Sequence, residues 1–519
     1  ADGVVSGVIF NDVDGDGTRG DNTAEPGIPD LTVFVDENGD GILNGGERSS
    51  TTTADGSYTI DQLSGALQAV RVVLPGVTTN QTNPLGNTFT KLTLNTVDSP
   101  VEVATGDFNG DGVDDIATTI NQVSEVRLFL NNGAGSFTAG GSVQVSGGPG
   151  SITAGSFLGA NGRDGLVVGH RTTSSVNVLL PQPDNSFNVV DLITPQDVQV
   201  GGQYAGLGNA PYMVTTGDFN ADGNDDIAVV SQNALPAGGA VGVFLSDGVG
   251  NFNHEQTLTL PRVDADFPTS ITAGLVNAGT TVDLVISNLS TANVTILKNS
   301  GNAGSSRFSI DQHLPVLGNA PSSVQTGDLD GDGDNEIVTT NLLSNNISIF
   351  DNNGDGTFST ASVLTAGQGP AFAELIDIDQ NNGLDIAFSN SDAGTRFGIL
   401  RNKGDGTFLA AETSGLALLS DGTLAFSLVT GQFDDDNGDG VIDATDTPDV
   451  VVSNRSGESL NSAAGSLTVG LNTIVPGALS VELPTGTRSA NGLNIGLRTI
   501  NLPPTITDPD DPAPIDEDA

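Results

Sequence analysis

Residues 107–115, read D-F-N-G-D-G-V-D-D, decide the fold because this stretch recurs along the chain. Oxygen-bearing side chains stand at alternate positions, a glycine follows the third of them, and a carboxylate occupies the ninth position. Calcium takes six to eight oxygen ligands at about 2.3–2.6 Å, and a tight loop points alternate side chains at one centre. The glycine permits the backbone conformation that the sharp turn requires. The stretch is therefore predicted to be a calcium loop.

Three further stretches repeat the pattern: D-F-N-A-D-G-N-D-D (218–226), D-L-D-G-D-G-D-N-E (328–336) and D-I-D-Q-N-N-G-L-D (377–385). One Asp-rich turn would be ordinary solvated structure, because Asp and Asn favour turns. Four copies of one spacing favour calcium, and the number of oxygens in each loop favours calcium over magnesium. The predicted ligand positions are Asp107, Asn109, Asp111, Val113, Asp115, Asp218, Asn220, Asp222, Asn224, Asp226, Asp328, Asp330, Asp332, Asp334, Glu336, Asp377, Asp379, Asn381, Gly383 and Asp385.

The composition narrows the class of protein. The chain of 519 residues carries 16 Lys and Arg against 64 Asp and Glu, a formal charge of -48, which repels nucleic acid and anionic membranes. Because 36% of the residues are hydrophobic, the acidity does not indicate disorder, and bound cations are expected to neutralise part of it. The chain has no Cys, which excludes disulfides and thiol chemistry, and no apolar run long enough to span a membrane.

The calcium loop belongs to a longer repeat between about residue 98 and residue 480. A β-run ends in T-G-D-F, the loop follows, and then come an apolar strand such as 226–230, a second strand such as 126–130, and a tight turn that ends in Phe, such as 131–137. Positions equivalent to Asp107 fall near Ser156, Asp218, Leu275, Asp328, Asp377 and Gln432, which makes seven copies. Seven units of four strands predict an all-β fold, a seven-bladed β-propeller over residues 89–500.

Three copies depart from the motif. The second, S-F-L-G-A-N-G-R-D-G, and the fourth, L-V-N-A-G-T-T-V-D, lack alternating acids and are predicted to bind no calcium. The seventh carries a longer loop of twelve positions, whose predicted ligands are Asp435, Asn437, Asp439, Val441, Asp443 and Asp446. Either of two free strands, 89–94 or 478–483, could complete the last blade.

Residues 1–88 form a separate β-unit with two further loops of the calcium type. Residues 36–47 fit the twelve-residue pattern fully, with predicted ligands Asp36, Asn38, Asp40, Ile42 and Glu47. The other loop is predicted to use Asp12, Asp14, Asp16, Thr18 and Glu25. With the loops of the repeat, about seven calcium sites are expected. Residues 501–519 are rich in Pro and Asp and are expected to form an extended linker.

Both parts resemble known families. The repeats, with their T-G-D-F and D-x-N/D-x-D-G motifs, resemble the FG-GAP/VCBS repeats that also form the calcium-binding propellers of integrin alpha-subunit heads. Residues 7–17 (G-V-I-F-N-D-V-D-G-D-G), 25–33 (E-P-G-I-P-D-L-T-V) and 54–60 (A-D-G-S-Y-T-I) resemble the SdrD B-like repeats of bacterial surface adhesins. The second resemblance implies an N-terminal prealbumin-like β-sandwich that binds calcium.

The sequence favours a secreted bacterial surface or matrix protein with a role in adhesion or surface assembly. In it, calcium would be structural and no catalysis is expected, because His170, His254 and His313 should not converge and no nucleophile motif appears. A polysaccharide lyase or hydrolase stays open as an alternative, as does a receptor head for glycan or protein, because a propeller hosts many functions. A partner face opposite the calcium loops is hypothesised around Arg171, Arg262, Arg396 and Arg455.

Overall fold

The structure is a computed structural model of the whole chain. It describes residues 3–11, 27–36, 48–63, 68–73, 79–81, 86–96, 98–159, 163–199, 202–233, 238–262, 266–277, 279–304, 307–378, 383–391, 397–409, 411, 424–435, 442, 446–455, 465–475, 479–481 and 489–499. The chain divides into two compact units, Ala1–Gly86 with Ile474–Ala519, and Asn87–Thr473. No helix among the described residues has the length and apolar character needed to cross a membrane.

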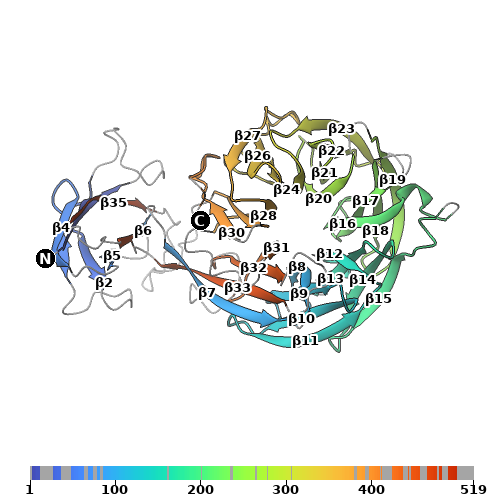
Figure 1. Cartoon of the computed structure of the whole chain (residues 1–519), viewed down its shortest axis with the longest axis horizontal. Helices are drawn as coiled ribbons and strands as arrows, with labels where there is room; N and C mark the ends of the chain where they lie inside the picture. The colour runs from blue at the N-terminus through green and yellow to red at the C-terminus, as the bar shows by residue number, and fades with distance from the viewer. Residues whose placement is uncertain are drawn as a thin grey trace, which may run out of the picture. The chain divides into compact units, whose positions relative to one another are not determined.

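The second unit is a ring of seven antiparallel sheets, as the sequence predicts (Figure 1). In blade 1, β8 (Pro100–Gly106), β9 (Asp115–Ile120), β10 (Glu125–Asn131) and β11 (Phe137–Gln144) pair in chain order. Every residue of β9 is buried, whereas most residues of β11 are exposed. A middle strand has a neighbouring blade on both of its faces, which explains why D-I-A-T-T-I shows no polar alternation.

The other blades repeat this meander. Blade 2 consists of β12 (Pro149–Gly155), β13 (Gly165–His170), β14 (Ser175–Pro181) and β15 (Phe187–Ile193). Blade 3 consists of β16 (Asn209–Gly217), β17 (Asp226–Asn233), β18 (Gly239–Ser246) and β19 (Phe252–Leu260). Blade 4 consists of β20 (Pro268–Gly274), β21 (Asp283–Asn288), β22 (Asn293–Asn299) and β23 (Phe308–Pro315).

Blade 5 consists of β24 (Pro321–Gly327), β25 (Glu336–Asn341), β26 (Asn346–Phe350) and β27 (Ser362–Thr365). Blade 6 shows three strands within its described residues, β28 (Pro370–Ile376), β29 (Asp385–Asn390) and β30 (Phe397–Leu400). Blade 7 consists of β31 (Leu424–Gly431), β32 (Asp449–Arg455), β33 (Ser466–Val475) and, from the start of the unit, β7 (Gly86–Asn95).

The ring closes through β7, which lies next to β33 in the sheet of blade 7. Of the two strands that could complete this blade, the structure therefore uses 89–94. The other candidate contributes β34 (Leu479–Val481), which pairs with β5 (Gln68–Val73) of the first unit. The first and last strands of the propeller thus pair in one sheet, and this pairing closes the ring.

The T-G-D-F motif places an aromatic side chain between blades. Phe108, Phe157, Phe219 and Phe433 are all at most 2% exposed. A Cβ atom on Gly155 would come within 2.7 Å of the Phe157 ring, and one on Gly431 would come equally close to the Phe433 ring. The glycine is therefore needed because the aromatic ring two residues later packs directly over it, and this ring then joins the core between adjacent blades.

The first unit contains two four-stranded sheets, in the orders β4-β1-β35-β6 and β3-β2-β5-β34. The described strands are β1 (Gly3–Asn11), β2 (Thr32–Asp36), β3 (Ser49–Thr51), β4 (Ser57–Leu63), β6 (Thr79–Gln81) and β35 (Ser489–Thr499), with β5 and β34 given above. A prealbumin-like arrangement of these sheets stays a prediction.

The sequence predicts that the propeller ends at residue 500, whereas in the structure the second unit ends at Thr473. β35 pairs in parallel with β1, Val4 opposite Ser489, so residues expected to end the propeller belong to the first unit. Parallel neighbours cannot be joined by a hairpin and need a long crossover. Here that crossover contains the complete propeller, which is inserted into the first unit. Residues 501–519, the expected linker, lie outside the described part of the chain.

Candidate metal centre

The first residue of each complete loop folds the loop around its own carboxylate. The two oxygens of Asp107 accept hydrogen bonds from the backbone N–H groups of Gly110 (2.6 Å), Asp111 (3.1 Å) and Gly112 (2.8 Å). Asp328 accepts equivalent bonds from Gly331 (2.7 Å) and Gly333 (3.0 Å). Gly112 and Gly333 have φ values of 86° and 94°, a region that favours glycine and explains the fixed D-G dipeptide.

Alternate side chains of the loop converge at its exposed surface. In blade 5, carboxylate oxygens of Asp328, Asp330 and Asp332 lie within 4.8 Å of one another. In blades 1 and 3 the third position is Asn, whose amide nitrogen lies 2.9 Å from the fifth carboxylate in both loops. The carboxylates and the Asn side chains can all supply oxygen ligands, as calcium prefers, and three like charges as close as those of blade 5 repel one another without a cation. The residues at these positions fit a calcium ion.

The ninth carboxylate is buried and holds its own blade together. Asp115 is 0% exposed; one oxygen accepts the N–H of Phe108 (3.2 Å) and the other that of Asn131 (2.8 Å). The equivalent pair of bonds forms at Asp226, Glu336 and Asp385, and also at Asp449. The carboxylate thus ties the start of the loop to the end of the third strand. Its role as a calcium ligand stays a prediction.

Burial raises the pKa of the ninth carboxyl in several blades. The pKa values of Asp115, Asp226 and Glu336 are each raised to about 7, first because these groups lose water, and further because nearby loop carboxylates repel the charged form. The backbone N–H groups oppose this shift. A calcium ion bound in the same loop would favour the ionised form and lower these pKa values.

The eighth residue links neighbouring blades, a role that the spacing did not predict. Asp114 accepts the N–H of Gln432 in blade 7 (3.0 Å). Asp225 accepts the N–H of Ser156 in blade 2 (2.8 Å). In blade 2, whose loop is one residue longer, Asp164 directly precedes the second strand and accepts the N–H of Asp107 (3.1 Å). The repeated D-D doublet was the sequence signal for this role. The side chain of its first Asp bonds to the preceding blade, and the side chain of its second Asp bonds within its own blade.

A ring of Asn side chains makes a second link between blades. Asn131, at the end of β10, donates to the carbonyl oxygen of Phe433 in blade 7 (2.8 Å). The same bond to the preceding blade recurs at Asn299, Asn352, Asn402 and Asn472. Each acceptor is the second residue of a loop, so the fold of one loop is coupled to the next blade. Pro181 holds this position in blade 2 and has no side-chain donor.

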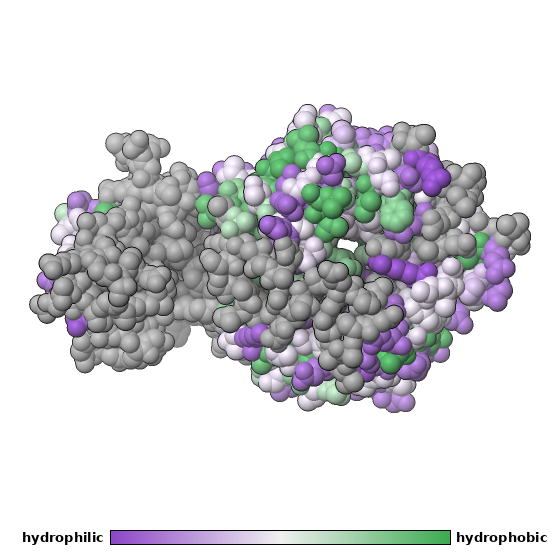
Figure 2. All heavy atoms as spheres, in the orientation of Figure 1, coloured by the Kyte–Doolittle hydropathy of each residue, from purple (hydrophilic) through white to green (hydrophobic). Residues whose placement is uncertain are grey.

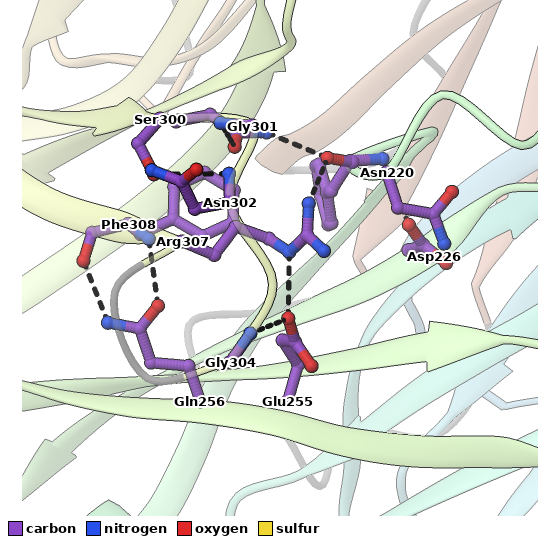
Figure 3. Close-up of polar contacts among 12 residues, drawn as sticks. Asn220, Asp226, Glu255, Gln256, Ser300, Gly301, Asn302, Gly304, Arg307 and Phe308 are labelled. Atoms are coloured by element: carbon purple, nitrogen blue, oxygen red, sulfur yellow. Dashed lines mark hydrogen bonds and ion pairs between the residues drawn. The ribbon is translucent and has the colours of Figure 1, made fainter.

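The seam between blades 3 and 4 adds a buried ion pair (Figure 3). Arg307 is 4% exposed, and its guanidinium donates to Glu255 (3.1 Å) and to the carbonyl oxygen of Phe219 (3.0 Å). Beside it, Gln256 exchanges two hydrogen bonds with the backbone of Phe308. The loop of blade 3 is therefore held from blade 4 by a charged side chain as well as by Asn299.

The remaining predicted residues are only partly described. In blade 6, Asp377, Gly383 and Asp385 are described, whereas Asp379 and Asn381 lie outside the described residues. In blade 7, Asp446 is buried and Asp435 is half-buried. The predicted ligands that lie outside the described residues are Asn437, Asp439, Val441, Asp443, Asn38, Asp40, Ile42, Glu47, Asp12, Asp14, Asp16, Thr18 and Glu25, and the side chain of Asp36 is not described.

The hypothesised Arg face is described at two positions. Arg171 follows β13 and Arg262 follows β19, both on the face opposite the calcium loops, because successive strands of a blade run in opposite directions. Arg262 forms an exposed ion pair with Asp266 at 3.3 Å. Arg396 and the side chain of Arg455 lie outside the described part of the chain. A partner for this face stays a prediction.

The central channel contains a second acidic feature. The innermost strands of all seven blades line a cavity of about 360 Å³ that includes Glu102 and Glu374, and Figure 2 shows an opening near the middle of the ring. Glu102 accepts the N–H of Ile152 (2.9 Å). Loss of water, and then the charge of Glu102, raise the pKa of Glu374 to about 8. Neither residue stood out in the sequence, because their proximity arises only when the ring closes.

Two segments match known repeats: residues 99–145 match the FG-GAP repeat, and residues 328–388 match the FG-GAP-like repeat. No curated protein matches the chain.

Among solved structures, the chain is similar to BBS1N in complex with ARL6DN, with 9% identity, coverage of 72% of this chain and 96% of that chain, and a TM-score of 0.48. It is also similar to an Agrocybe aegerita lectin that recognises non-reducing terminal N-acetylglucosamine (16% identity, 78% and 93% coverage, TM-score 0.41). A third similar structure is virginiamycin B lyase from Staphylococcus aureus with quinupristin, with 11% identity, coverage of 74% of this chain and 100% of that chain, and a TM-score of 0.45. This chain is a seven-bladed β-propeller that carries FG-GAP repeats.

Proposed function

We propose that the protein is a secreted, calcium-loaded surface or matrix protein of bacteria that acts in adhesion or surface assembly. The observation that carries this proposal is the loop geometry: three carboxylates gather at the surface of the blade 5 loop, and its ninth residue, Glu336, joins the start of that loop to the end of the third strand. In blades 1 and 3, the eighth residue of the equivalent loop also bonds to the preceding blade. Calcium would then act structurally. Extracellular calcium modules work at affinities of about 10⁻⁴–10⁻³ M, which suits a protein outside the cell.

The charge of the chain supports the same role. A formal charge of -48 opposes folding through self-repulsion, and cations bound in the loops offset part of it. The FG-GAP propeller is compatible with surface and adhesion roles. The resemblance of the first unit to SdrD B-like adhesin repeats supports the same setting, as do its two four-stranded sheets.

The test is thermal unfolding with 2 mM calcium and with excess chelator, while assembly is followed by light scattering and electron microscopy in the same samples. Calcium is expected to raise the midpoint of propeller unfolding by about ten degrees or more, because several bound ions stabilise the folded state together. Assembly that requires calcium would support the surface role. If chelation changes neither stability nor assembly, the structural role of calcium is wrong.

A polysaccharide lyase or hydrolase is the second candidate function. One observation favours it: Glu102 and Glu374 face one channel, and the pKa of Glu374 is raised to about 8, the direction that a general acid needs. The test is turnover on a panel of neutral and acidic polysaccharides. Activity that is lost in both Glu102→Gln and Glu374→Gln, with unfolding midpoints unchanged, would establish it; no turnover by the wild-type chain would exclude it for that panel.

A further inference from the structure

One connection between blades is much longer than its neighbours. Residues 194–208 join blades 2 and 3, whereas residues 145–148 join blades 1 and 2, and residues 366–369 join blades 5 and 6. Long ordered connections in compact domains commonly serve function. This one is anchored: Val198 and Leu207 are buried in the core between blades 2 and 3, and the 3₁₀ turn η2 (Ala205–Leu207) follows Tyr204.

The anchored connection forms one wall of a groove. The groove has a volume of about 610 Å³, and its other walls come from β15 in blade 2 and the turn before β19 in blade 3. Leu158, Leu180 and Val190 contribute apolar surface. Gly250 lies in the turn, and a Cβ atom there would meet Leu180 at 2.7 Å, so the wall is closely packed. The groove is therefore held between two rigid blades.

Tyr204 is positioned by contacts on several sides. Its ring packs edge-on against Phe244 with centroids 5.3 Å apart, and it lies 4.8 Å from the ring of His254. Its hydroxyl accepts a hydrogen bond from Gln203 (2.9 Å), and its backbone N–H donates to the carbonyl of Asp197 (2.7 Å). Tyr204 nevertheless lines the groove and is only half-buried. A fixed aromatic ring at the wall of a groove costs little entropy when a ligand binds.

One carboxylate at the groove is held in place but keeps one oxygen for a ligand. One oxygen of Asp197 accepts the N–H (2.8 Å) and hydroxyl (2.7 Å) of Thr194. Within the described part of the chain, the second oxygen of Asp197 has no hydrogen bond. The side chain of Asp191 lies on the other face of β15, where it accepts the amide of Asn177 (2.7 Å). The side chains of Asn188 and Asn251, which supply both donors and acceptors, also line the groove.

These side chains together indicate the class of ligand. The described lining has no Lys or Arg, so Asp197 disfavours an anion. Amides that donate and a carboxylate that accepts match a ligand dense in hydroxyl groups, while a Tyr ring and aliphatic side chains match its C–H surface. A cationic side chain would use the carboxylate but would leave the amide donor of Asn188 unpaired. We propose that this groove binds a neutral saccharide, with Tyr204 against a sugar ring, Asp197 accepting one hydroxyl and Asn188 donating to another.

The test uses the full chain in calcium and follows binding by saturation-transfer NMR and titration calorimetry. The probes are cellotriose and mannotriose as neutral saccharides, trigalacturonate as an acidic one, and trilysine as a cationic peptide. At least one neutral saccharide is expected to bind, with transfer to its C–H protons, and trigalacturonate is not. If neither neutral saccharide binds, or if only trilysine does, the proposal is wrong.

The variants separate the site from general stability. Asn188→Ala changes an exposed group on the outer strand of blade 2, so it is expected to keep the unfolding midpoint while it weakens binding about tenfold. Tyr204→Phe keeps the ring and is expected to bind within a few-fold of wild type. The matched controls are Asp191→Asn, an exposed acid on the other face of the same strand, and Asp311→Asn, an exposed acid on the outer strand of blade 4.

Binding that is unchanged in Asn188→Ala would overturn the proposal, as would equal loss in Asp191→Asn or Asp311→Asn. The turn before β19 packs close to Asn224, a predicted calcium ligand, so all binding is measured in saturating calcium. The proposal is then tested by saccharide binding and the proposed function by chelator sensitivity, so the failure of one is distinguishable from the failure of the other.

Discussion

Single residues of the repeated loop carry different duties. The first, third and fifth positions gather oxygens at the surface, as Asp328, Asp330 and Asp332 do. The ninth, Asp115, is buried and ties two parts of its own blade, while the eighth, Asp114, reaches Gln432 in the neighbouring blade. One nine-residue stretch therefore combines a candidate metal site with the contacts that position the blades.

Asn131 offers a test of the links between blades. Asn131→Ala removes a buried donor to the Phe433 carbonyl and leaves the N–H of Gly133 without its acceptor, which is expected to destabilise the propeller by about 1–3 kcal/mol in urea unfolding. The control is its neighbour, Asn132→Ala, because Asn132 is exposed and bonds only within its own turn. A loss below about 1 kcal/mol is expected there. Equal effects in the two variants would contradict a special role for the ring of Asn side chains.

Glu374 makes a prediction about pH. Its pKa is raised to about 8 in the folded protein, first by loss of water and then by Glu102, and its unfolded value is that of an ordinary Glu. The folded state thus holds the proton more tightly, and its stability should fall as the pH rises from about 4.5 to about 8. Between pH 5 and pH 8, the wild-type propeller is expected to lose about 1–3 kcal/mol more stability than Glu374→Gln.

Urea unfolding of both proteins at pH 5, 6.5 and 8 checks this difference. The calcium loops titrate in both proteins, so their contribution cancels in the comparison. Parallel pH profiles for the wild type and Glu374→Gln would show that Glu374 ionises normally in the channel.

At the scale of elements, two loops that lack the alternating acids still keep one of the structural contacts of the motif. One keeps the buried carboxylate that bonds within its own blade, and the other keeps a bond to the preceding blade. In blade 4, Asp283 still accepts the N–H of Asn299 (2.7 Å), although the alternating acids are gone. The blade 2 loop is one residue longer, so Gly165 pairs with Gly155 where Asp115 pairs with Gly106 in blade 1. Asp164, just before it, binds the N–H of Asp107 in blade 1, and a Cβ atom on Gly110 would lie 2.8 Å from Arg163. The contacts that hold the blades together can therefore be present in a loop that lacks the predicted calcium ligands.

If each complete loop binds one calcium ion, a change of one predicted ligand should lower the number of bound ions by one. Asp328→Asn alters the first position of the blade 5 loop and is expected to lower the bound calcium by one ion, measured by equilibrium dialysis at 1 mM calcium. Asp355→Asn, an exposed acid in the next turn of the same blade, is the control and is expected to leave the count unchanged. The same count in both variants would remove the blade 5 loop from the calcium sites.

At the scale of the whole chain, the propeller is an insertion into the first unit. The chain enters the ring through β7 and leaves it through β33, and these strands are neighbours in one sheet. The closeness of entry and exit lets a closed ring be inserted between β6 and β34. The first unit then depends on a strand, β35, that is nearly the whole chain away from its partner β1 in sequence.

A truncation tests this dependence. Removal of residues 476–519 deletes β34 and β35, and each four-stranded sheet of the first unit loses one strand. Limited proteolysis is expected to cleave the first unit rapidly while the propeller keeps its calorimetric transition, because all of its described strands remain. A first unit that stays resistant to protease would show that β34 and β35 are dispensable for it.

The sequence by itself determined the seven repeats, the strands within them and the calcium spacing, because loop residues 107–115 and their copies are local patterns fixed by turn geometry. The tertiary structure decided which strand closes the ring, that β35 belongs with β1, and that Glu102 meets Glu374. It also brought Tyr204, Asn188 and the turn before β19 into one groove. These contacts join residues that are distant in sequence, and no local propensity records them, because they form only when the blades pack into a ring.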